Sequence, residues 1–460
     1  MARDLSGVTA DITATLAGFE GTILGPGDGD YDQARTLFNA MIDRRPAVIA
    51  RCASVADVQK AVNAARNTGV ALAVRGGGHN VAGNALCDGG LVIDLTGLRK
   101  VTVDPVRRRA WAEGGATWAD FDAATQAHGL ATTGGAVSST GIAGLTLGGG
   151  IGWLMRKHGL ACDNLASVDL VTAAGTVVRA STGEHPELFW GLRGGGGNFG
   201  VATAFEYRLH PVATIYGGLV VHPFPRAMEV LQFYRDFAAR APDEVTVNAV
   251  LLTGPDGQPA VGIAGCHCGS LAEGERVMKP LKSFGPPVMD HMGPIPYGAG
   301  LQKMIDGPFG YGMRNYWKSN FLNRLDDALF GALIEAYAGV PSPRSAILIE
   351  QGGGAVAAVS PDETAVNFRD APFNLLIVSM WTEATDDAAN RDWARALFEA
   401  SRPFDAAQAY VNYLGAEADD GGDRIKAAYG PDKYARLARL KAHYDPGNLF
   451  RQNQNIPPAT

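Results

Sequence analysis

Apolar and polar positions near the start of the chain alternate in blocks of strand and helix length. The apolar run AVIARC follows Pro46, and SVADVQKAVNAARNTG then places apolar residues at helical spacing before a second run, ALAVRG. Ser54 stands three residues before Asp57, which is typical of a capped helix N-terminus. The pattern predicts a strand, a helix and a strand, the unit that opens an α/β arrangement.

The next part of the chain predicts short strands and two more helices. LVIDL and VTVDPVRRRAWAEGGA favour β segments, Trp118–His128 favours an amphipathic helix, and VDLVTAAGTVVRA favours a hairpin turning at Ala174–Gly175. PELFWGLRG then predicts a short helix, and VATAFEYRLHP a strand ending at Pro211. The intervening segment Gly129–Gly152 holds little that could form a regular helix or strand. So long a loop inside a compact domain is either functional or a sign that an element has been overlooked.

Beyond Pro211 the pattern changes to long strands and amphipathic helices. VTVNAVLLTGPDGQPAVGIAGC predicts a hairpin at Asp256–Gly257, and SAILIEQGG and FNLLIVSMWTE predict buried strands. RAMEVLQFYRDFAAR and AANRDWARALFEASR predict helices. We therefore expect an α+β fold in four parts: a lead-in at 1–42, a first domain at 43–212, a second domain with an antiparallel sheet backed by helices at 213–414, and a C-terminal segment at 415–460.

Composition narrows the class of protein. Apolar residues are 46% and charged residues 19% of 460, as in an ordinary soluble enzyme, and a net charge of -7 argues against a nucleic-acid partner. Five cysteines are few for a chain of this length, and an odd number cannot all pair, so we expect no disulfide framework. The N-terminus lacks the apolar core of a signal peptide, and no apolar run reaches membrane-spanning length. We expect a cytoplasmic protein with no membrane partner.

Glycine is the compositional outlier, with 59 residues and three runs at Gly76–Gly78, Gly148–Gly150 and Gly194–Gly197. The last run, continued to Gly200, matches G-x-G-x-x-G, but a predicted helix precedes it and a strand follows, the reverse of a dinucleotide-binding fold. With Ser138 and its neighbours, the runs suggest a flat channel for a long phosphorylated cofactor.

Eight segments stand out in order along the chain: SVADVQKAVNAAR, RGGGHN, VIDL, AEGGATW, GLTLGGGIGWLMRKHGLACDN, LFWGLRGGGGNFGV, YVNY and DPGNLFRQNQNIPP. Together they resemble the berberine-bridge-enzyme-like branch of the vanillyl-alcohol-oxidase flavoproteins, whose FAD-binding domain is of the PCMH type. The resemblance implies that 43–212 binds FAD, that 213–414 binds the substrate, and that 415–460 returns to the FAD-binding domain.

The resemblance also implies how the cofactor is held. In this family the histidine after the glycines bonds covalently to the methyl carbon of the flavin's dimethylbenzene ring, and His79 stands at that position. Many relatives have a second, cysteinyl anchor, but Val137 or a neighbouring serine stands where that cysteine would be, and Cys162 lies on the wrong side of the glycines. We expect one covalent link. The other implied contacts are Arg75, Gly76, Gly77, Gly78, Asn80, Gly83, Val137, Ser138, Gly141, Gly144, Leu145, Gly148, Gly149, Gly150, Gly152, Asn164, Gly200, Val201, Asn453 and Asn455.

Catalysis needs a base, because an alcohol or amine that loses hydride must also lose a proton. The family's Y-x-N-Y motif is Tyr410, Val411, Asn412 and Tyr413, and Tyr413 is the expected base. If the motif is a strand, both tyrosines share one face and Asn412 the other; the alternative role of the tyrosines is core packing. Polar residues that could address the substrate are Tyr311, Glu350, Gln351 and Trp381.

Four functions remain open at this point. The leading one is an FAD-dependent oxidase that forms hydrogen peroxide from molecular oxygen; Thr140 lies close to the position that controls oxygen access in the family. The second is a dehydrogenase with another electron acceptor, and the third is a flavin-binding protein without turnover. The fourth is a nucleotide-binding enzyme without flavin, which a colourless purified protein would favour. We expect no metal site, since His267 between Cys266 and Cys268 lacks further ligands nearby. The small-molecule substrate is not identified by the sequence.

Overall fold

The computed structural model describes residues 5–416 and 422–460, so residues 1–4 of the expected lead-in and 417–421 of the expected C-terminal segment lie outside the described part. The first sheet has the order β1-β2-β4-β3, with β2, β4 and β3 parallel and β1 antiparallel. Its elements are β1 (Thr22–Leu24), β2 (Val48–Arg51), β3 (Leu72–Arg75), β4 (Leu91–Asp94), α1 (Ser6–Thr15), α2 (Tyr31–Ala34) and α3 (Val55–Thr68).

The strand–helix–strand prediction is confirmed by β2, α3 and β3. The Ser54 hydroxyl accepts a hydrogen bond from the Asp57 backbone N–H at 3.2 Å, so the expected cap is present. The Asp57 carboxylate in turn accepts from the backbone N–H groups of Glu20 and Gly21, at 2.9 Å each. The first turn of α3 therefore also anchors the chain that enters β1.

The second sheet is antiparallel, in the order β5-β6-β10-β8-β9. Gly195–Gly200 lies between α7 and β10, which confirms that this glycine run does not open a dinucleotide-binding helix. The elements of this part are β5 (Val101–Asp104), β6 (Arg109–Glu113), β8 (Leu165–Val171), β9 (Val177–Ser181), β10 (Val201–Arg208), the pair β7 (Leu130–Ala131) and β11 (His210–Pro211), α4 (Trp118–Gln126), α5 (Ile142–Leu147), α6 (Met155–His158), the 3₁₀ helix η1 (Ala161–Asn164) and α7 (Pro186–Leu192).

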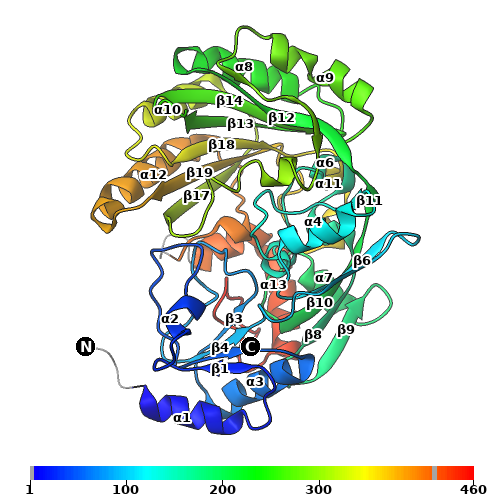
Figure 1. Cartoon of the computed structure of the whole chain (residues 1–460), viewed down its shortest axis with the longest axis vertical. Helices are drawn as coiled ribbons and strands as arrows, with labels where there is room; N and C mark the ends of the chain where they lie inside the picture. Colours follow the sequence, from blue (N-terminus) through cyan, green and yellow to red (C-terminus); the bar gives the residue numbers. More distant parts are fainter. Residues whose placement is uncertain (1–4, 417–421) are drawn as a thin grey trace.

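The third sheet is the largest, in the order β15-β12-β14-β13-β18-β19-β17, with β16 paired to β12. Helices α8, α9, α10 and α12 cover its outer face, and its inner face is turned toward the smaller sheets (Figure 1). The elements are β12 (Thr214–Pro223), β13 (Val245–Thr253), β14 (Pro259–His267), β15 (Met289–Asp290), β16 (Gly293–Pro296), β17 (Arg314–Leu322), β18 (Ala346–Gln351), β19 (Phe373–Trp381), α8 (Ala227–Ala238), α9 (Leu271–Ser283), α10 (Asp327–Ala338), α11 (Ala355–Ala358) and α12 (Asp387–Ser401).

Alternation along the central strands of this sheet separates two environments. Val247 and Ile349 belong to the hydrophobic core under the helices, whereas Asn248 and Leu348 line a cavity on the opposite face. Successive side chains of a strand point to opposite faces, so one strand serves both the core and the cavity. The α+β class, with an antiparallel sheet backed by helices, is confirmed.

Two local predictions are wrong. The segment Gly129–Gly152 contains β7 and the short helix α5. Glycines at both ends of α5 hid its helical pattern in the sequence. The Y-x-N-Y motif is not a strand, because Val411–Tyr413 forms a 3₁₀ helix, η7. With three residues per turn, Tyr410 and Tyr413 still lie side by side. Asn412, however, does not point away from them, since its side chain contacts Tyr410.

The last helix, α13 (Gly422–Tyr444), packs against α7 beside the second sheet (Figure 1). Leu437, Leu440 and Ile456 share a core cluster with residues of β8 and β10. The large sheet begins at Thr214, next to the expected division at 212/213. The four-part division remains our proposal, and these contacts support it.

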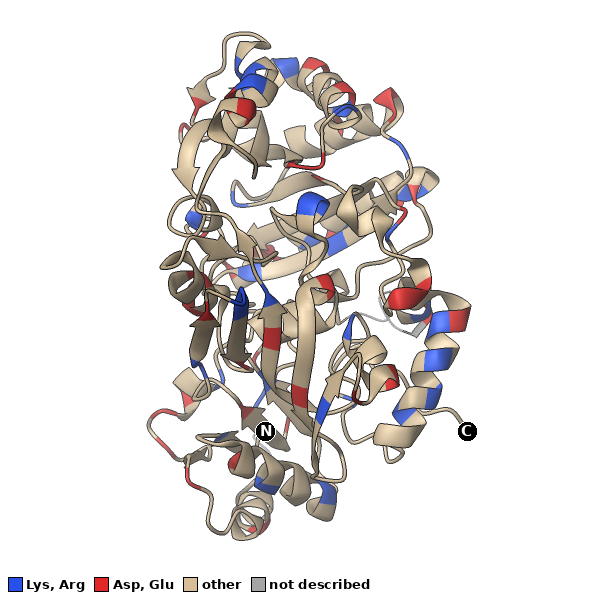
Figure 2. Cartoon of the chain, turned by 90° about the vertical axis from the view of Figure 1, so that its right-hand side faces the viewer, with Lys and Arg blue, Asp and Glu red and all other residues tan. Residues whose placement is uncertain are grey.

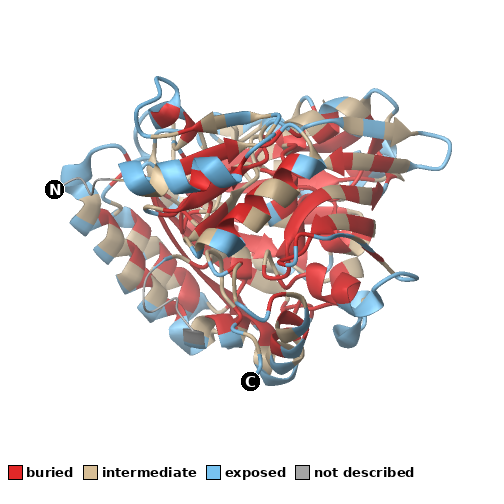
Figure 3. Cartoon of the chain, turned by 90° about the horizontal axis from the view of Figure 1, so that it is seen from below, coloured by how far each residue is buried: buried red, intermediate tan, exposed pale blue. Residues whose placement is uncertain are grey.

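Charge and burial are distributed as in an ordinary globular molecule. Basic and acidic residues are intermixed on the face drawn in Figure 2. The strands form the buried interior, and exposed positions concentrate on loops and outer helix faces (Figure 3). No helix within residues 5–416 and 422–460 is long and apolar enough to span a membrane.

Candidate active site

A cavity of about 710 Å³ lies between the glycine-rich loops and the inner face of the large sheet. Its walls come from the His79 loop, the segment around α5, the Gly196–Gly200 turn and the strands β13, β18 and β19. The Tyr410–Tyr413 motif and the segment Gln452–Gln454 complete the lining. A cavity of this size and mixed polarity is typical of cofactor and small-molecule sites.

His79 is at the cavity wall, stacked on a phenylalanine. The rings of His79 and Phe38 are 3.8 Å apart between centroids and inclined by 16°. The His79 Nε2 atom is buried and has no hydrogen-bond partner among the described residues. Burial lowers the pKa of His79 to about 4, so the imidazole is neutral at pH 7 and keeps a free electron pair.

The segment Leu37–Asn39, together with Tyr311, holds the His79 loop, and we call these four residues the clamp. The backbone N–H of Phe38 donates to the Gly78 carbonyl at 3.1 Å, and the Asn39 amide donates to the carbonyls of Val81 at 2.8 Å and Asn315 at 2.9 Å. The Tyr311 hydroxyl donates to the Gly77 carbonyl at 2.9 Å. Sequence reasoning missed Phe38 and Asn39, because no motif marks them.

Most of the predicted glycines make room for other parts of the protein. A Cβ on Gly77 would lie 2.3 Å from the Gly141 nitrogen, and one on Gly141 would lie 2.4 Å from the Gly77 nitrogen. A Cβ on Gly148 would lie 2.1 Å from the Asn412 side chain. Only open space faces Gly144 and Gly197, both of which line the cavity. The glycine runs therefore bring loops into contact first, and leave bare backbone for a ligand at a few positions.

Tyr410 and Asn412 connect the C-terminal segment to the glycine loop. The Tyr410 hydroxyl accepts hydrogen bonds from the Gly150 backbone N–H and from the Asn412 amide, both at 2.9 Å. The same amide donates to the Leu145 carbonyl at 3.0 Å. Burial raises the pKa of Tyr410 well above its usual value. This hydroxyl is occupied in positioning the loop, in line with the packing role left open for Tyr410.

Tyr413 pairs with Glu350. The Tyr413 hydroxyl donates to one Glu350 carboxylate oxygen at 3.2 Å, and the Asn374 amide donates to the other at 2.7 Å. Burial raises the pKa of Glu350 to about 7. Burial, and then the neighbouring Glu350, raise the pKa of Tyr413 well above its usual value. Of the two groups, Glu350 is the one that changes charge near neutral pH.

Strand alternation places the other expected substrate residues elsewhere. Gln351 follows Glu350 on β18 and points toward the helices, where its amide donates to the Ala238 carbonyl at 2.8 Å. Trp381 belongs to the core under the helices and donates to Asp387 at 2.8 Å. Neither lines the cavity, because each stands on the face opposite to it. Tyr311 serves in the clamp.

The expected cofactor residues separate into two groups. Besides His79, those that line the cavity are Gly76, Gly77, Gly78, Asn80, Val137, Gly141, Gly144, Leu145, Gly152, Gly200 and Asn453. The others do not line it and are Arg75, Gly83, Ser138, Gly148, Gly149, Gly150, Asn164, Val201 and Asn455. Sequence reasoning missed several lining residues, among them Gly135, Ala136, Asn198, Asn248, Gln452 and Gln454.

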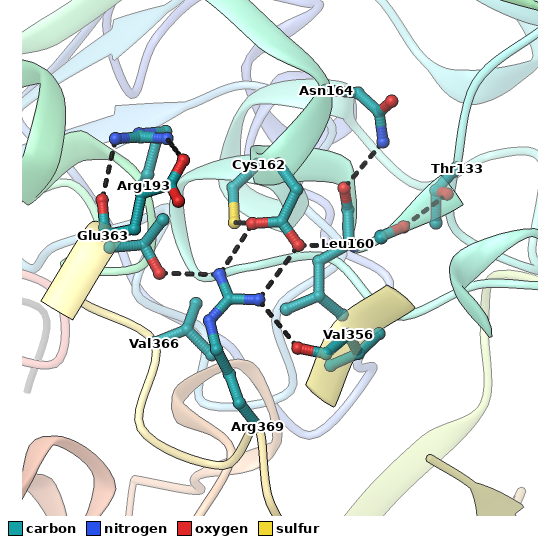
Figure 4. Close-up of polar contacts among 12 residues, drawn as sticks. Thr133, Leu160, Cys162, Asn164, Arg193, Val356, Glu363, Val366 and Arg369 are labelled. Carbon is teal, nitrogen blue, oxygen red and sulfur yellow. Dashed lines mark hydrogen bonds and ion pairs between the residues drawn. The ribbon is translucent and has the colours of Figure 1, made fainter. Parts of the chain in front are cut away.

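A buried ion pair joins η1 to the segment that precedes β19. The Arg369 guanidinium bonds both carboxylate oxygens of Asp163, at 2.6 Å and 3.1 Å, and also donates to the Thr364 hydroxyl (Figure 4). Cys162 lies in the same cluster, fully buried, with its Sγ 3.7 Å from Asp163. Burial raises the pKa of the Cys162 thiol. No cysteine occurs among the described residues that line the cavity.

The chemistry of the lining is largely neutral. Among its described residues, Arg344 is the only lysine or arginine and Glu350 the only carboxylate. Within the described ranges no three histidine, cysteine, aspartate or glutamate side chains gather in a way that could hold a metal ion. His267 is a buried residue of β14.

Comparisons with known proteins cover nearly the whole chain. Residues 46–181 match the family model of the FAD binding domain, and residues 409–457 match that of berberine and berberine-like proteins. An FAD-linked oxidoreductase of Dictyostelium discoideum is 31% identical over 98% of this chain and 98% of its own length. (R)-6-hydroxynicotine oxidase of Paenarthrobacter nicotinovorans is 31% identical over 97% of this chain and 98% of its own.

Solved structures agree with this assignment. The crystal structure of 6-hydroxy-D-nicotine oxidase from Arthrobacter nicotinovorans superposes with a TM-score of 0.87 at 28% identity and covers all of both chains. The sequence matches, the shared fold and the cavity between the glycine loops and the large sheet lead to one assignment. The chain belongs to the berberine-bridge-enzyme-like family of FAD-linked oxidoreductases.

Proposed function

We propose that this protein is an FAD-dependent oxidase that takes hydride from an alcohol, an amine or a related C–H donor of a small organic molecule and passes the electrons to oxygen. One observation carries the proposal: a single cavity is lined by neutral His79, on the clamped loop, and by the Tyr413–Glu350 pair. The first group suits attachment of a cofactor, and the second suits removal of a proton.

The residues present fit FAD. The glycine wall leaves open space at Gly144 and Gly197, and the buried Asn453 amide oxygen has no partner among the described residues. Because the glycine loops bring no lysine or arginine to the cavity, backbone N–H groups and amides would hold the diphosphate. Neutral His79 would form the covalent bond to the dimethylbenzene methyl carbon, and a lining without cysteine supports a single link.

Bound FAD would supply the hydride acceptor, and the protein handles the proton. A carboxylate whose pKa lies near 7 is a more effective base at neutral pH than a buried tyrosine whose pKa is raised. We therefore assign the final acceptance of the proton to Glu350. Tyr413 contacts the substrate and relays or orients that proton through its hydrogen bond to Glu350. This assignment revises the expectation of Tyr413 as the base.

The two electrons and two protons that leave the substrate reduce one O₂ to one H₂O₂ in the oxidase. A dehydrogenase on the same fold is the alternative, with the electrons going to another acceptor, and a flavin-binding protein without turnover is a third possibility. Thr140 lines the cavity close to the position expected to control oxygen access. The paired Tyr413 and Glu350 favour turnover over storage, because a storage protein needs no base.

The test begins with acid precipitation of the purified protein and its His79→Ala variant. We expect yellow colour in the wild-type pellet and in the variant's supernatant. Colour in both supernatants would rule out the covalent link but still support FAD binding. A colourless protein would overturn the assignment of a flavin.

Oxygen use can be measured without knowing the substrate. The flavin is reduced by light under anaerobic conditions, and air or a dye acceptor is then admitted. Rapid reoxidation with one H₂O₂ formed per flavin supports the oxidase. Slow reoxidation in air with fast reoxidation by the dye would identify a dehydrogenase. A panel of alcohols and amines that never bleaches the flavin would favour the protein without turnover.

A further inference from the structure

The inner face of the large sheet forms one long wall of the cavity, and the strand register fixes the order of its side chains. Glu350 on β18 stands opposite Asn248 on β13. Leu348 stands between Val250 on β13 and Leu376 on β19. All five side chains line the cavity, so the wall is polar at the Glu350 end and apolar beside it.

The same wall continues past its apolar part to a cation. Ala346 and Leu252 are the next lining residues in the direction away from Glu350, and Arg344 follows in the loop that leads into β18. Glu350 is six positions along the chain from Arg344, a spacing that corresponds to at most about 20 Å. The cavity therefore has a carboxylate at one position along this wall and a guanidinium at another, with apolar side chains between them.

Arg344 has features of a ligand-binding cation. It is solvent-exposed at the cavity, as is the neighbouring lining residue Pro343, so the cavity opens to solvent there. Its guanidinium has no carboxylate or carbonyl partner among the described residues; the backbone N–H alone is bonded, to Ser342. By contrast Arg314, at the start of β17, is held by Asp387 at 2.6 Å. An unpaired arginine at a cavity mouth is well suited to bind a carboxylate or another anion.

We propose that the substrate is an elongated amphipathic anion: an oxidisable hydroxyl or amine at one end, an apolar aliphatic or aromatic body, and a carboxylate or similar group at the other end. The hydroxyl or amine lies at Tyr413 and Glu350, the body lies along Leu348 and Val250, and the anionic group pairs with Arg344. This inference rests on the proposed function and narrows its substrate class. In oxidation of such an alcohol, bound FAD would supply the acceptor for the hydride that leaves the carbon, and the hydroxyl proton would go to Glu350.

Binding of substrate-like probes to the yellow holoenzyme tests the proposal through changes in the flavin absorbance spectrum. The probes are decanoate and decanol, which share an apolar chain and differ in charge. We expect decanoate to bind about tenfold more tightly, which corresponds to one charge-assisted hydrogen bond near the surface, and added NaCl to reduce the difference. In Arg344→Gln the preference should disappear while decanol affinity is retained.

Two further variants distinguish the role of Arg344 at the cavity mouth from the effect of losing any exposed arginine and from the role of the apolar wall. Arg324→Gln removes an exposed arginine paired with Asp326, outside the cavity lining, and should keep the preference for decanoate. Leu348→Trp fills the apolar part of the wall and should weaken both probes, with flavin content unchanged. Equal binding of decanoate and decanol by the wild type, or an unchanged preference in Arg344→Gln, would overturn the proposal. A protein without bound flavin would instead contradict the proposed function, so the two failures are distinguishable.

Discussion

Glu350 is the residue whose protonation should control the reaction near neutral pH. Burial raises its pKa from the ordinary 4.5 to about 7, so the carboxyl is neutral below this value and ionised above it. Only the ionised form accepts a proton, so we expect kcat/KM to rise as the pH increases through about 7. Pre-steady-state flavin reduction across pH gives the profile. Glu350→Gln should be slow at every pH and lose this rise; a variant that kept it would show that another group titrates.

The two tyrosines of η7 should respond differently to loss of their hydroxyls. Tyr413→Phe removes the contact to Glu350 and should slow flavin reduction by about 10²-fold with little change in thermal stability. Tyr410→Phe leaves the Gly150 backbone N–H without this acceptor and removes one of the two acceptors of the Asn412 amide, so it should cost about 1–2 kcal/mol of stability. Reduction rates and denaturant unfolding of both variants check this. Similar effects of the two substitutions would contradict the separate roles.

The clamp acts between secondary-structure elements, because it joins the segment before β2 to the loop after β3. Phe38→Leu keeps an apolar side chain but removes the ring that stacks on His79. We expect covalent attachment of FAD to be about tenfold slower, since the imidazole gains rotational freedom, while non-covalent FAD binding persists. The measurement is a time course of acid-precipitable flavin after FAD is added to apoprotein.

Two matched variants test whether the slower attachment is due to loss of the ring that stacks on His79. Phe38→Tyr retains the ring and should restore the rate. Phe309→Leu alters another aromatic residue of the cavity, which is edge-on to Trp317, and should leave attachment unchanged. If Phe38→Leu attached FAD as fast as the wild type, the clamp would have only a structural role.

Elements with strong local signals were predictable from the sequence, and those made by close contact were not. The capping pattern at Ser54 marked α3, and the Asp256–Gly257 turn marked the hairpin of β13 and β14. Helix α5 escaped because six residues between glycines carry too little periodicity. η7 escaped because a tyrosine-rich motif favours a strand, whereas hydrogen bonds to the glycine loop fix its conformation.

At the scale of the whole molecule, the buried pair Asp163–Arg369 ties η1 to the chain between α11 and β19. Both side chains are nearly inaccessible, at 9% and 4% exposure. Arg369→Met would leave the Asp163 carboxylate buried without its cation, and we expect a loss of about 3–5 kcal/mol in the free energy of unfolding. A second substitution in the same variant, Asp163→Asn, should recover part of the lost free energy of unfolding, because it removes the buried charge. Arg276→Met breaks an exposed pair with Glu273 and should leave unfolding unchanged, as measured by denaturant titration.

The sequence by itself determined the family, the FAD-binding class, the α+β fold and the place of His79 and the Y-x-N-Y motif. Ordered motifs and short-range spacing carry that information. Only the tertiary structure decided that Phe38 stacks on His79, that Glu350 pairs with Tyr413 while Gln351 faces the helices, and that most glycines accommodate protein rather than ligand. The physical reason is that these features depend on contacts between residues far apart in the chain, and on which face of a strand meets the cavity once the sheet is packed.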